Sequence, residues 1–255
     1  MMGVNHAATG AAAWVAVTST AIPAFGWYPL PAEAVLLGSS VAAGAALLPD
    51  ADHHNATIAH SVPVLGGVAA GAVGLVTGGH RKGMHSLLAI AGVVVGMFFL
   101  GQLQWQPQGW QIPIQIGSAA AVAATTAFAF KVLGGRRWLT AWVLGALLAG
   151  LVALLMPSQF AWLPVCIGVG YAAHIAGDLL TFGGVPLLWP LQPAPPGPIR
   201  RAVLFKWMWK PSGRFAVPIL GSTGKDPQEH VLGTLAGLYA AWGAIGAVIV
   251  LWPWK

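Results

Sequence analysis

Histidine and aspartate residues, the side chains best suited to metal ligation in this chain, gather in short clusters. The stretch "LLPDADHH" at 47–54 holds two of the six acidic residues and two of the eight histidines. Further clusters are "GHRKGMHS" at 79–86, "HIAGD" at 174–178 and "KDPQEH" at 225–230, and His6 stands near the start. Imidazole and carboxylate groups without thiolate suit Zn, Mn, Fe or Mg, so these clusters predict a metal site.

His174 and Asp178 are the pair with the most informative spacing. Because they are four residues apart, they project from one face of a helix and can share an ion. An aspartate within a membrane costs roughly 2.5–3.5 kcal/mol on insertion scales, so Asp178 needs a partner. The single cysteine, Cys166, lies in an apolar run. A disulfide framework and a Cys-based zinc finger are therefore excluded, and any metal must use histidine and carboxylate ligands.

The elements that must position these clusters are membrane helices. The chain is 57% hydrophobic and 7% charged, whereas an ordinary globular domain is roughly 25% charged. The first apolar segment opens without Lys or Arg, so we expect a retained span and not a cleaved signal peptide. A span needs about 20 mostly apolar residues, with a range down to about 17. Segments that qualify or nearly qualify lie near 7–22, 32–48, 62–78, 85–101, 112–133, 138–156, 160–180 and 231–252.

Topology decides whether the clusters can meet. If segment 62–78 crossed the membrane, the acids of 47–54 would lie on the face opposite the histidines of 79–86. If it lies in the interface or re-enters, every cluster shares one face with the basic loops 131–137 and 181–230, and the positive-inside rule makes that face cytoplasmic. We therefore predict an all-α, polytopic transmembrane bundle of about seven spans plus one interfacial or re-entrant helix. It forms a single membrane domain over 1–255, with a membrane-surface loop at 181–230.

Two pairs of charged residues have a structural alternative to a functional role. Asp50 and Asp52 could be solvated loop acids, but their place beside two histidines at the end of an apolar segment favours a site. Arg81 and Lys82 fit a topology signal and a contact to a substrate phosphate equally well. Both interpretations of this basic pair stay open.

The remaining candidates also carry alternatives. His80 and His85 would be about 140° apart on a helix, so we expect at least one of them in the loop before a helix, and a pair of surface histidines is the alternative. Glu229 fits a ligand, but it also fits a helix start in which Asp226 is the N-cap and a proline and an acid follow. The histidines expected to be interfacial or to lie outside the ligand shell are His54, His60 and His230.

The motifs "LLPDADH", "HRKGMHS" and "HIAGDLLTFGGVPLLWP" together resemble a bacterial family of inner-membrane-associated proteins assigned as metal-dependent hydrolases, some of them described as LexA-binding. The resemblance spans most of the chain and implies a multi-pass protein of the inner membrane. The chain departs from the family pattern at Met84, where a threonine is usual, and it has two extra spans between 101 and 160. The positions that match the family pattern are His6, Asp50, Asp52, His53, His80, Arg81, His85, Ser86, His174, Asp178, Thr181 and Glu229.

These observations predict a metal-dependent hydrolase that acts on an ester, a lipid phosphoester foremost, at the cytoplasmic face. A catalytic zinc ion usually takes three protein ligands and a water, so a larger set indicates two or more ions, with zinc preferred over Mn, Fe or Mg. Asp52 or His85 would move the proton and Arg81 would contact phosphate. The set is similar to that of zinc-dependent phospholipases C. The expected ligands are His6, Asp50, Asp52, His53, His80, His85, His174, Asp178 and Glu229.

Other classes of function compete with this prediction. A metal transporter or a metal-sensing regulatory membrane protein would also bind metal, but its ligands should lie near the membrane midplane, whereas these clusters lie at segment ends. A lipid phosphatase of the acid phosphatase type is disfavoured because "PSGR" at 211–214 lacks the required histidine. The expected partners are membrane lipid and a small-molecule or lipid substrate, and no nucleic acid. The sequence leaves the oligomeric state open.

Overall fold

The computed structural model of the chain is built from helices, and it describes residues 1–255 except 22, 64, 136, 202–206 and 253–255. The described residues form no β-strand beyond isolated bridges, as the predicted all-α class requires. The α-helices are α1 (Gly3–Thr18), α2 (Ala32–Ala45), α3 (Leu65–Thr77), α4 (Leu87–Leu100), α5 (Ile116–Gly134), α6 (Trp138–Leu155), α7 (Leu163–Leu179), α8 (Gly197–Arg201) and α10 (Pro227–Leu251). Short 3₁₀ helices are η1 (Leu48–Asp52), η2 (Thr57–His60), η3 (Gly83–His85) and η4 (Pro157–Trp162).

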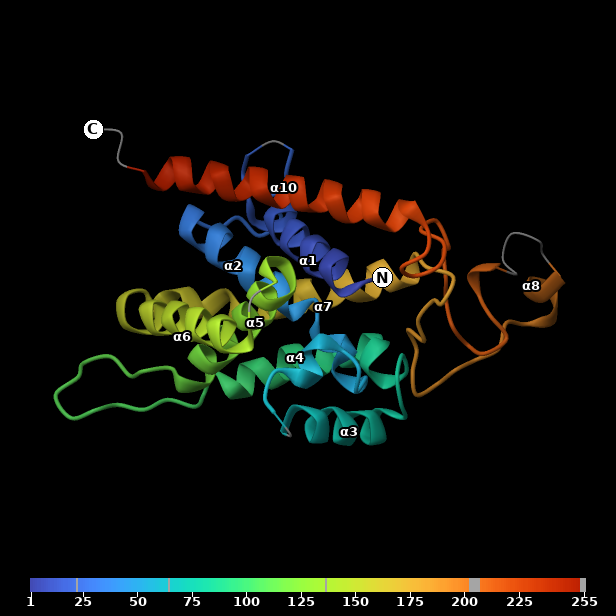
Figure 1. Ribbon diagram of the computed structural model, residues 1–255, viewed down its shortest axis with the longest axis horizontal. Helices are drawn as coiled ribbons and strands as arrows, with labels where there is room; N and C mark the ends of the chain where they lie inside the picture. The colour runs from blue at the N-terminus through green and yellow to red at the C-terminus, as the bar shows by residue number, and fades with distance from the viewer. Residues whose placement is uncertain (22, 64, 136, 202–206, 253–255) are drawn as a thin grey trace.

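Three helices, α1, α2 and α7, pack against one another at the centre of the bundle, as Figure 1 shows. Helix α10 lies along one side of α1, the α5–α6 hairpin lies against α2, and α4 packs on α7. Small residues allow this approach: a Cβ atom at Gly10 or at Gly170 would lie 2.6 or 2.4 Å from the carbonyl oxygen of Ala42. Small residues are the usual packing device of helices in lipid.

Each of the eight predicted apolar segments overlaps a helix of the structure, but the lengths of these helices differ. Five stretches are long and apolar enough to cross a membrane: Ala32–Asp52, Ile116–Gly134, Trp138–Leu155, Phe160–Leu179 and Pro227–Leu251. Helices α3 and α4 are shorter, and α1 has 16 residues. Seven spans therefore stay a prediction. The first helix starts earlier than the predicted 7–22, so His6 lies inside α1 and not beside it.

Segment 62–78, predicted not to cross, becomes α3 at the edge of the bundle (Figure 1). Most of its described side chains are exposed or half-exposed, and Ala70 is the buried exception. The residues on either side of it meet, since His80 Nδ1 lies 2.9 Å from Asp52 Oδ1. The chain between 53 and 79 thus leaves one place and returns to it, which is the property that the single-site argument required.

The long loop after α7 folds back toward the helix that precedes it. Backbone hydrogen bonds join Val185 to Phe215 in both directions, at 2.8 and 2.9 Å, and Val217 N donates to Leu179 O at 2.7 Å. The short helix α8 lies at the far tip of this loop (Figure 1). As a result, residues near 214 lie beside the C-terminal end of α7, far from their position in sequence.

Candidate metal centre

Four elements bring the predicted ligands together at one end of the bundle. The N-terminal part of α1 carries His6, η1 carries Asp50, η3 carries His85, and the last turns of α7 carry His174 and Asp178. All are fully buried except the Asp50 side chain, which is 25% exposed. We call these five residues the inner cluster. Both histidines of 79–86 lie before α4, because Ser86 caps that helix by accepting a hydrogen bond from Ala89 N at 3.2 Å.

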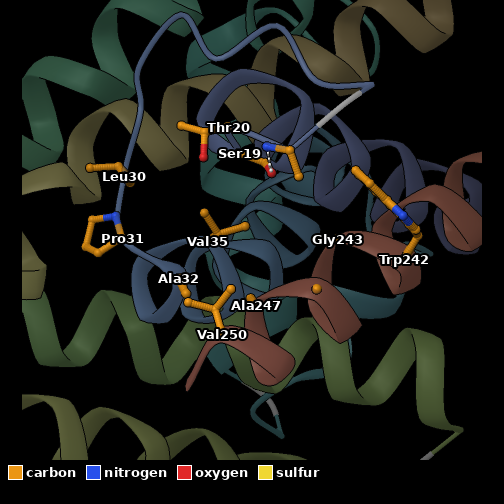
Figure 2. Close-up of a pocket in the computed structure, with 12 residues that line it drawn as sticks. Ser19, Thr20, Leu30, Pro31, Ala32, Val35, Trp242, Gly243, Ala247 and Val250 are labelled. Carbon is orange, nitrogen blue, oxygen red and sulfur yellow. Dashed lines mark hydrogen bonds between the residues drawn. The ribbon is translucent and has the colours of Figure 1, made fainter. Parts of the chain in front are cut away.

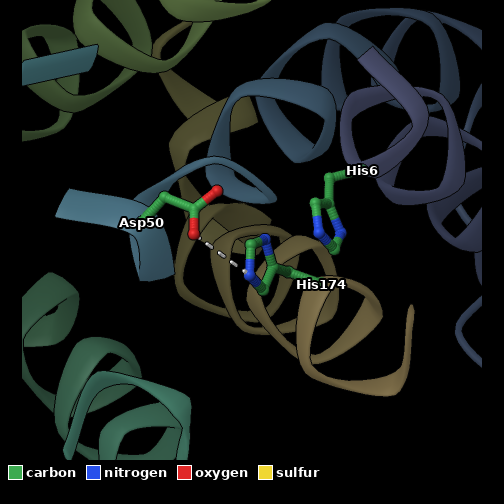
Figure 3. Close-up of side chains that lie close together, drawn as sticks. All are labelled: His6, Asp50 and His174. Carbon is green, nitrogen blue, oxygen red and sulfur yellow. Dashed lines mark ion pairs between the residues drawn. The ribbon is translucent and has the colours of Figure 1, made fainter. Parts of the chain in front are cut away.

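The inner cluster contains two overlapping groups of potential metal ligands. One is His6, Asp50 and His174, which face one another in Figure 3, and the other is His85, His174 and Asp178. Within each group the ligand atoms lie within 4.8 Å of one another. The ring of His6 stacks on that of His174 with centroids 3.6 Å apart. Because His174 belongs to both groups, they describe one continuous site.

The protonation state of His174 is set by a backbone carbonyl. Its Nδ1 lies 2.7 Å from the carbonyl oxygen of Ala46, and since that oxygen can only accept, Nδ1 carries the proton. In a neutral ring Nε2 then carries no proton and presents a lone pair. This nitrogen lies 3.2 Å from Nε2 of His85. A histidine that donates from one ring nitrogen to a carbonyl and presents the other is the usual arrangement of a metal ligand.

The spacing of the cluster fits ligands of one ion better than hydrogen bonds. Nε2 of His85 and Nε2 of His174 lie 3.6 and 3.8 Å from Asp178 Oδ2, and 3.7 and 3.8 Å from Asp50 Oδ1. Hydrogen bonds are shorter than this. With bonds of about 2.0–2.1 Å, a tetrahedral zinc ion separates two ligand nitrogens by about 3.3 Å. The donor types and their separations therefore fit a divalent ion such as zinc.

Several buried polar atoms of the cluster lack a hydrogen-bond partner among the described residues. They are Nδ1 and Nε2 of His6, Nδ1 of His85 and Oδ2 of Asp178. Leaving such an atom unsatisfied costs about 1–3 kcal/mol, so four in one place are costly unless something binds them. Asp178 adds to this cost, because it lies in the last turn of α7, where the helix dipole disfavours an acid. A bound cation would remove both penalties.

A second, more exposed group of predicted residues borders the inner cluster. Asp52 Oδ1 lies 2.9 Å from His80 Nδ1, and its Oδ2 accepts from the backbone N–H of Arg81 at 3.1 Å. The same Oδ2 lies 3.8 Å from His85 Nδ1. The ring of His53 packs on that of His80 with centroids 4.4 Å apart. We call Asp52, His53 and His80 the outer group. Asp52 thus lies next to His85, one of the inner ligands, at a separation longer than a hydrogen bond.

Arg81 contacts both the outer group and the inner cluster, and its own backbone is in a strained conformation. Its guanidinium Nη2 lies 3.1 Å from each oxygen of Asp178, which also accepts from the amino group of Met1 and lies 3.3 Å from His6 Nε2. Its φ is 55°, and a left-handed backbone costs a non-glycine residue roughly 1–2 kcal/mol. The contacts of both its side chain and its backbone hold it in this conformation.

Two cationic residues near Asp178, Lys210 and Arg214, were not predicted as part of the site. Arg214 Nη2 donates to the carbonyl oxygen of Arg81 at 3.3 Å, and Lys210 Nζ donates to that of Phe182. Burial lowers the pKa of Arg214, and the charge of Arg81 lowers it further, while Asp178 raises it. The Pro-Ser-Gly turn before Arg214 was the available signal, since Gly213 has a φ of 76° that favours glycine.

Glu229 is the predicted ligand that the structure does not bring to the cluster. Its Oε1 accepts from Met2 N and from Asn5 Nδ2 at 2.9 Å, and its Oε2 accepts from Gly224 N at 2.7 Å. The carboxylate thus ties α1 to the loop before α10. Helix α10 begins at Pro227 after Asp226, as the capping alternative expected, but the Asp226 carboxylate accepts from Ser222 N at 2.6 Å and not from the helix.

Among the hollows on the described part of the bundle, two lie at opposite ends of α1 and bear on the site. A groove of about 440 Å³ lies beside the inner cluster between α3 and α4, and its apolar lining includes Val76, Leu88, Val93 and Trp189, while Ser86 links it to His85. A pocket of about 320 Å³ lies at the other end of α1, between Ser19, the start of α2 and the last turns of α10 (Figure 2). Neither hollow has an ionisable Asp, Glu, His, Lys or Arg among its described lining residues.

The comparisons with known proteins identify the family. The profile described as YdjM inner membrane protein matches residues 1–253, so the chain belongs to this family of bacterial inner membrane proteins. No curated protein and no solved structure gives a significant match.

Proposed function

We propose that this protein is a membrane-embedded, metal-dependent hydrolase that cleaves a lipid phosphoester at the cytoplasmic face of the inner membrane. The observation that carries the proposal is the inner cluster. Five His and Asp side chains lie at ligand spacing, three of them with buried atoms that lack a hydrogen-bond partner within the described residues, in a buried site next to an apolar groove.

The inner cluster would hold the catalytic ion, with zinc preferred. A second ion has a candidate place between Asp52, His80 and Nδ1 of His85. Such ions supply a water of lowered pKa and a positive charge beside an ester oxygen. The chain's own residues would do the rest: with a single ion in the inner cluster, Asp52 would stay unligated and would accept and return the proton, and Arg81 would contact the phosphate.

A lipid substrate is supported by the groove beside the cluster. Apolar side chains of α3 and α4 line it, and Tyr171 and Met84 are among its other lining residues. A hydrocarbon chain in this groove would place an attached headgroup near Ser86, which follows His85.

The cytoplasmic face and the seven spans are part of the proposal, and they rest on the return of 53–79 to one place and on the positive-inside rule. Cysteines placed at Ala56 and at Lys82 in a Cys166→Ser background test them. Both should react with an impermeant thiol reagent only when the inner face is exposed. Labelling of one from outside and the other from inside would show that α3 crosses the membrane.

The activity is tested with purified, metal-loaded protein in detergent or liposomes. We expect release of product from a phospholipid, a lysophospholipid or a polyprenyl phosphate, and none with Asp178→Asn. Hydrolysis of only a soluble, uncharged ester would refute the phosphoester substrate but keep the hydrolase. Metal uptake into proteoliposomes without hydrolysis of any ester would instead support a metal transporter or sensor.

A further inference from the structure

Three cationic side chains gather beside Asp178, on the side where the long loop folds back. Arg81 Nη2 lies 3.1 Å from Asp178, and Arg214 Nη2 donates to the carbonyl oxygen of Arg81 at 3.3 Å. Lys210 Nζ donates to the carbonyl oxygen of Phe182, four residues beyond Asp178. Three residues from two separate segments thus surround the end of α7.

This group carries more positive charge than its surroundings neutralise. Asp178 pairs with Arg81, but within the described residues neither Lys210 nor Arg214 has a carboxylate within 4.0 Å. Nε of Arg214 is buried and has no hydrogen-bond partner in the same part of the chain. The charge of Arg214 also lowers the pKa of Lys210, an effect that adds to the larger one of burial. A buried, unpaired donor and adjacent like charges both favour the binding of an anion.

The backbone is shaped to bring these side chains together. A Cβ atom at Gly183 would lie 2.3 Å from Arg81 Nη1, so the guanidinium packs directly against the backbone of this glycine. At Gly213 a Cβ atom would lie 2.6 Å from the backbone of Gln192. The turn at Gly213 thus packs closely against this backbone and positions the next residue, Arg214. The close contacts indicate a specific site and not a loose surface patch.

We infer that Arg81, Lys210 and Arg214 form an anion subsite that holds a phosphate group next to the inner cluster. A guanidinium has five donors in a planar fork, so Arg81 can serve Asp178 and still contact a phosphate oxygen. Arg214 offers its free Nε–H, and Lys210 adds a point charge. The inference deepens the proposed function and rests on it, since it names the residues that would recognise the phosphate of the substrate.

The test measures binding of phosphate compounds to the purified, metal-loaded protein by calorimetry. The ligands are inorganic phosphate, glycerol 3-phosphate and a short-chain phosphatidic acid. Arg214→Gln should weaken binding of all three about tenfold, as expected for loss of one charged hydrogen bond, and Lys210→Gln should weaken it less. Lys225→Gln, which removes an exposed lysine near the end of the same long loop, is the matched control and should bind as the wild type does.

The subsite is refuted if Arg214→Gln and Lys210→Gln retain their metal and bind phosphate as tightly as the wild type, or if the wild type binds none of the three ligands. Should Arg214→Gln fail to fold, Lys210→Gln and Arg214→Lys decide the matter. Tighter binding of phosphatidic acid than of glycerol 3-phosphate supports a lipid source of the phosphate, and equal binding supports a soluble one. Weakened phosphate binding in a protein that hydrolyses only uncharged esters would leave the subsite standing and overturn the phosphoester substrate.

Discussion

The two ends of α1 offer the same packing but different chemistry. At one end, His6 lies in the inner cluster, where four buried side-chain atoms have no hydrogen-bond partner within the described residues. At the other end, Ser19 borders an apolar pocket of about 320 Å³ (Figure 2), and the nearest acid in sequence, Glu33, follows a residue of its lining. Small residues let α1, α2 and their neighbours approach closely along the helix. The apolar pocket therefore has no histidine or carboxylate among its described lining residues that could ligate an ion, whereas the inner cluster offers five such side chains.

The largest difference between the ends should come from Asp178→Asn. This change removes a charged ligand and leaves the side-chain shape, so it should lower metal affinity by more than the roughly 10–100-fold that loss of an orienting partner costs, and abolish hydrolysis. Glu33→Gln, the matched change near the apolar pocket, should alter neither. Equal metal content and activity in the two variants would erase the distinction between the ends.

A smaller effect is expected from Asp52→Asn in the outer group. If Asp52 orients His85 and moves a proton, its loss should reduce turnover by about 10–100-fold while the purified protein keeps its inner ion. Turnover and metal content measured on the same preparation test this. Complete loss of metal would instead make Asp52 a direct ligand of the inner ion.

The smallest effect should follow from filling the apolar pocket. Ala32→Leu adds a side chain at its rim, and we expect unchanged metal content and a change in unfolding free energy within about 1 kcal/mol. Thermal unfolding and metal analysis measure both quantities. A loss of metal would show that the two ends are coupled through α1 and α2.

Much of the arrangement could be predicted because it depends on local patterns. Apolar length placed the helices, and the four-residue spacing of His174 and Asp178 placed them on one face, where their Nε2 and Oδ2 atoms lie 3.8 Å apart. The requirement for a shared site, together with the placement of basic residues, predicted that the two ends of segment 62–78 meet, and His80 Nδ1 does lie 2.9 Å from Asp52 Oδ1. These features follow from helix geometry and from the cost of burying charge.

The rest depends on contacts between distant backbone atoms. Glu229 looks like a ligand in sequence, yet its partners are the N–H groups of Met2 and Gly224 and the amide of Asn5, which no spacing rule reveals. Arg214 reaches Arg81 only because the loop closes through the Val185–Phe215 bridge. A hydrogen bond to a backbone group does not depend on the type of the residue that supplies it. The contacts of Glu229 and of Arg214 could therefore be found only from the three-dimensional structure.

The central claim, that the inner cluster holds a divalent ion, is tested most directly by locating the metal. Crystals of the purified protein should give an anomalous-scattering peak enclosed by His6, Asp50, His85, His174 and Asp178. Elemental analysis should find about one or two ions per chain, and His174→Ala, which removes the ligand common to both groups, should lose the peak. A wild-type protein without metal at this position, or an unchanged peak in His174→Ala, would contradict the account.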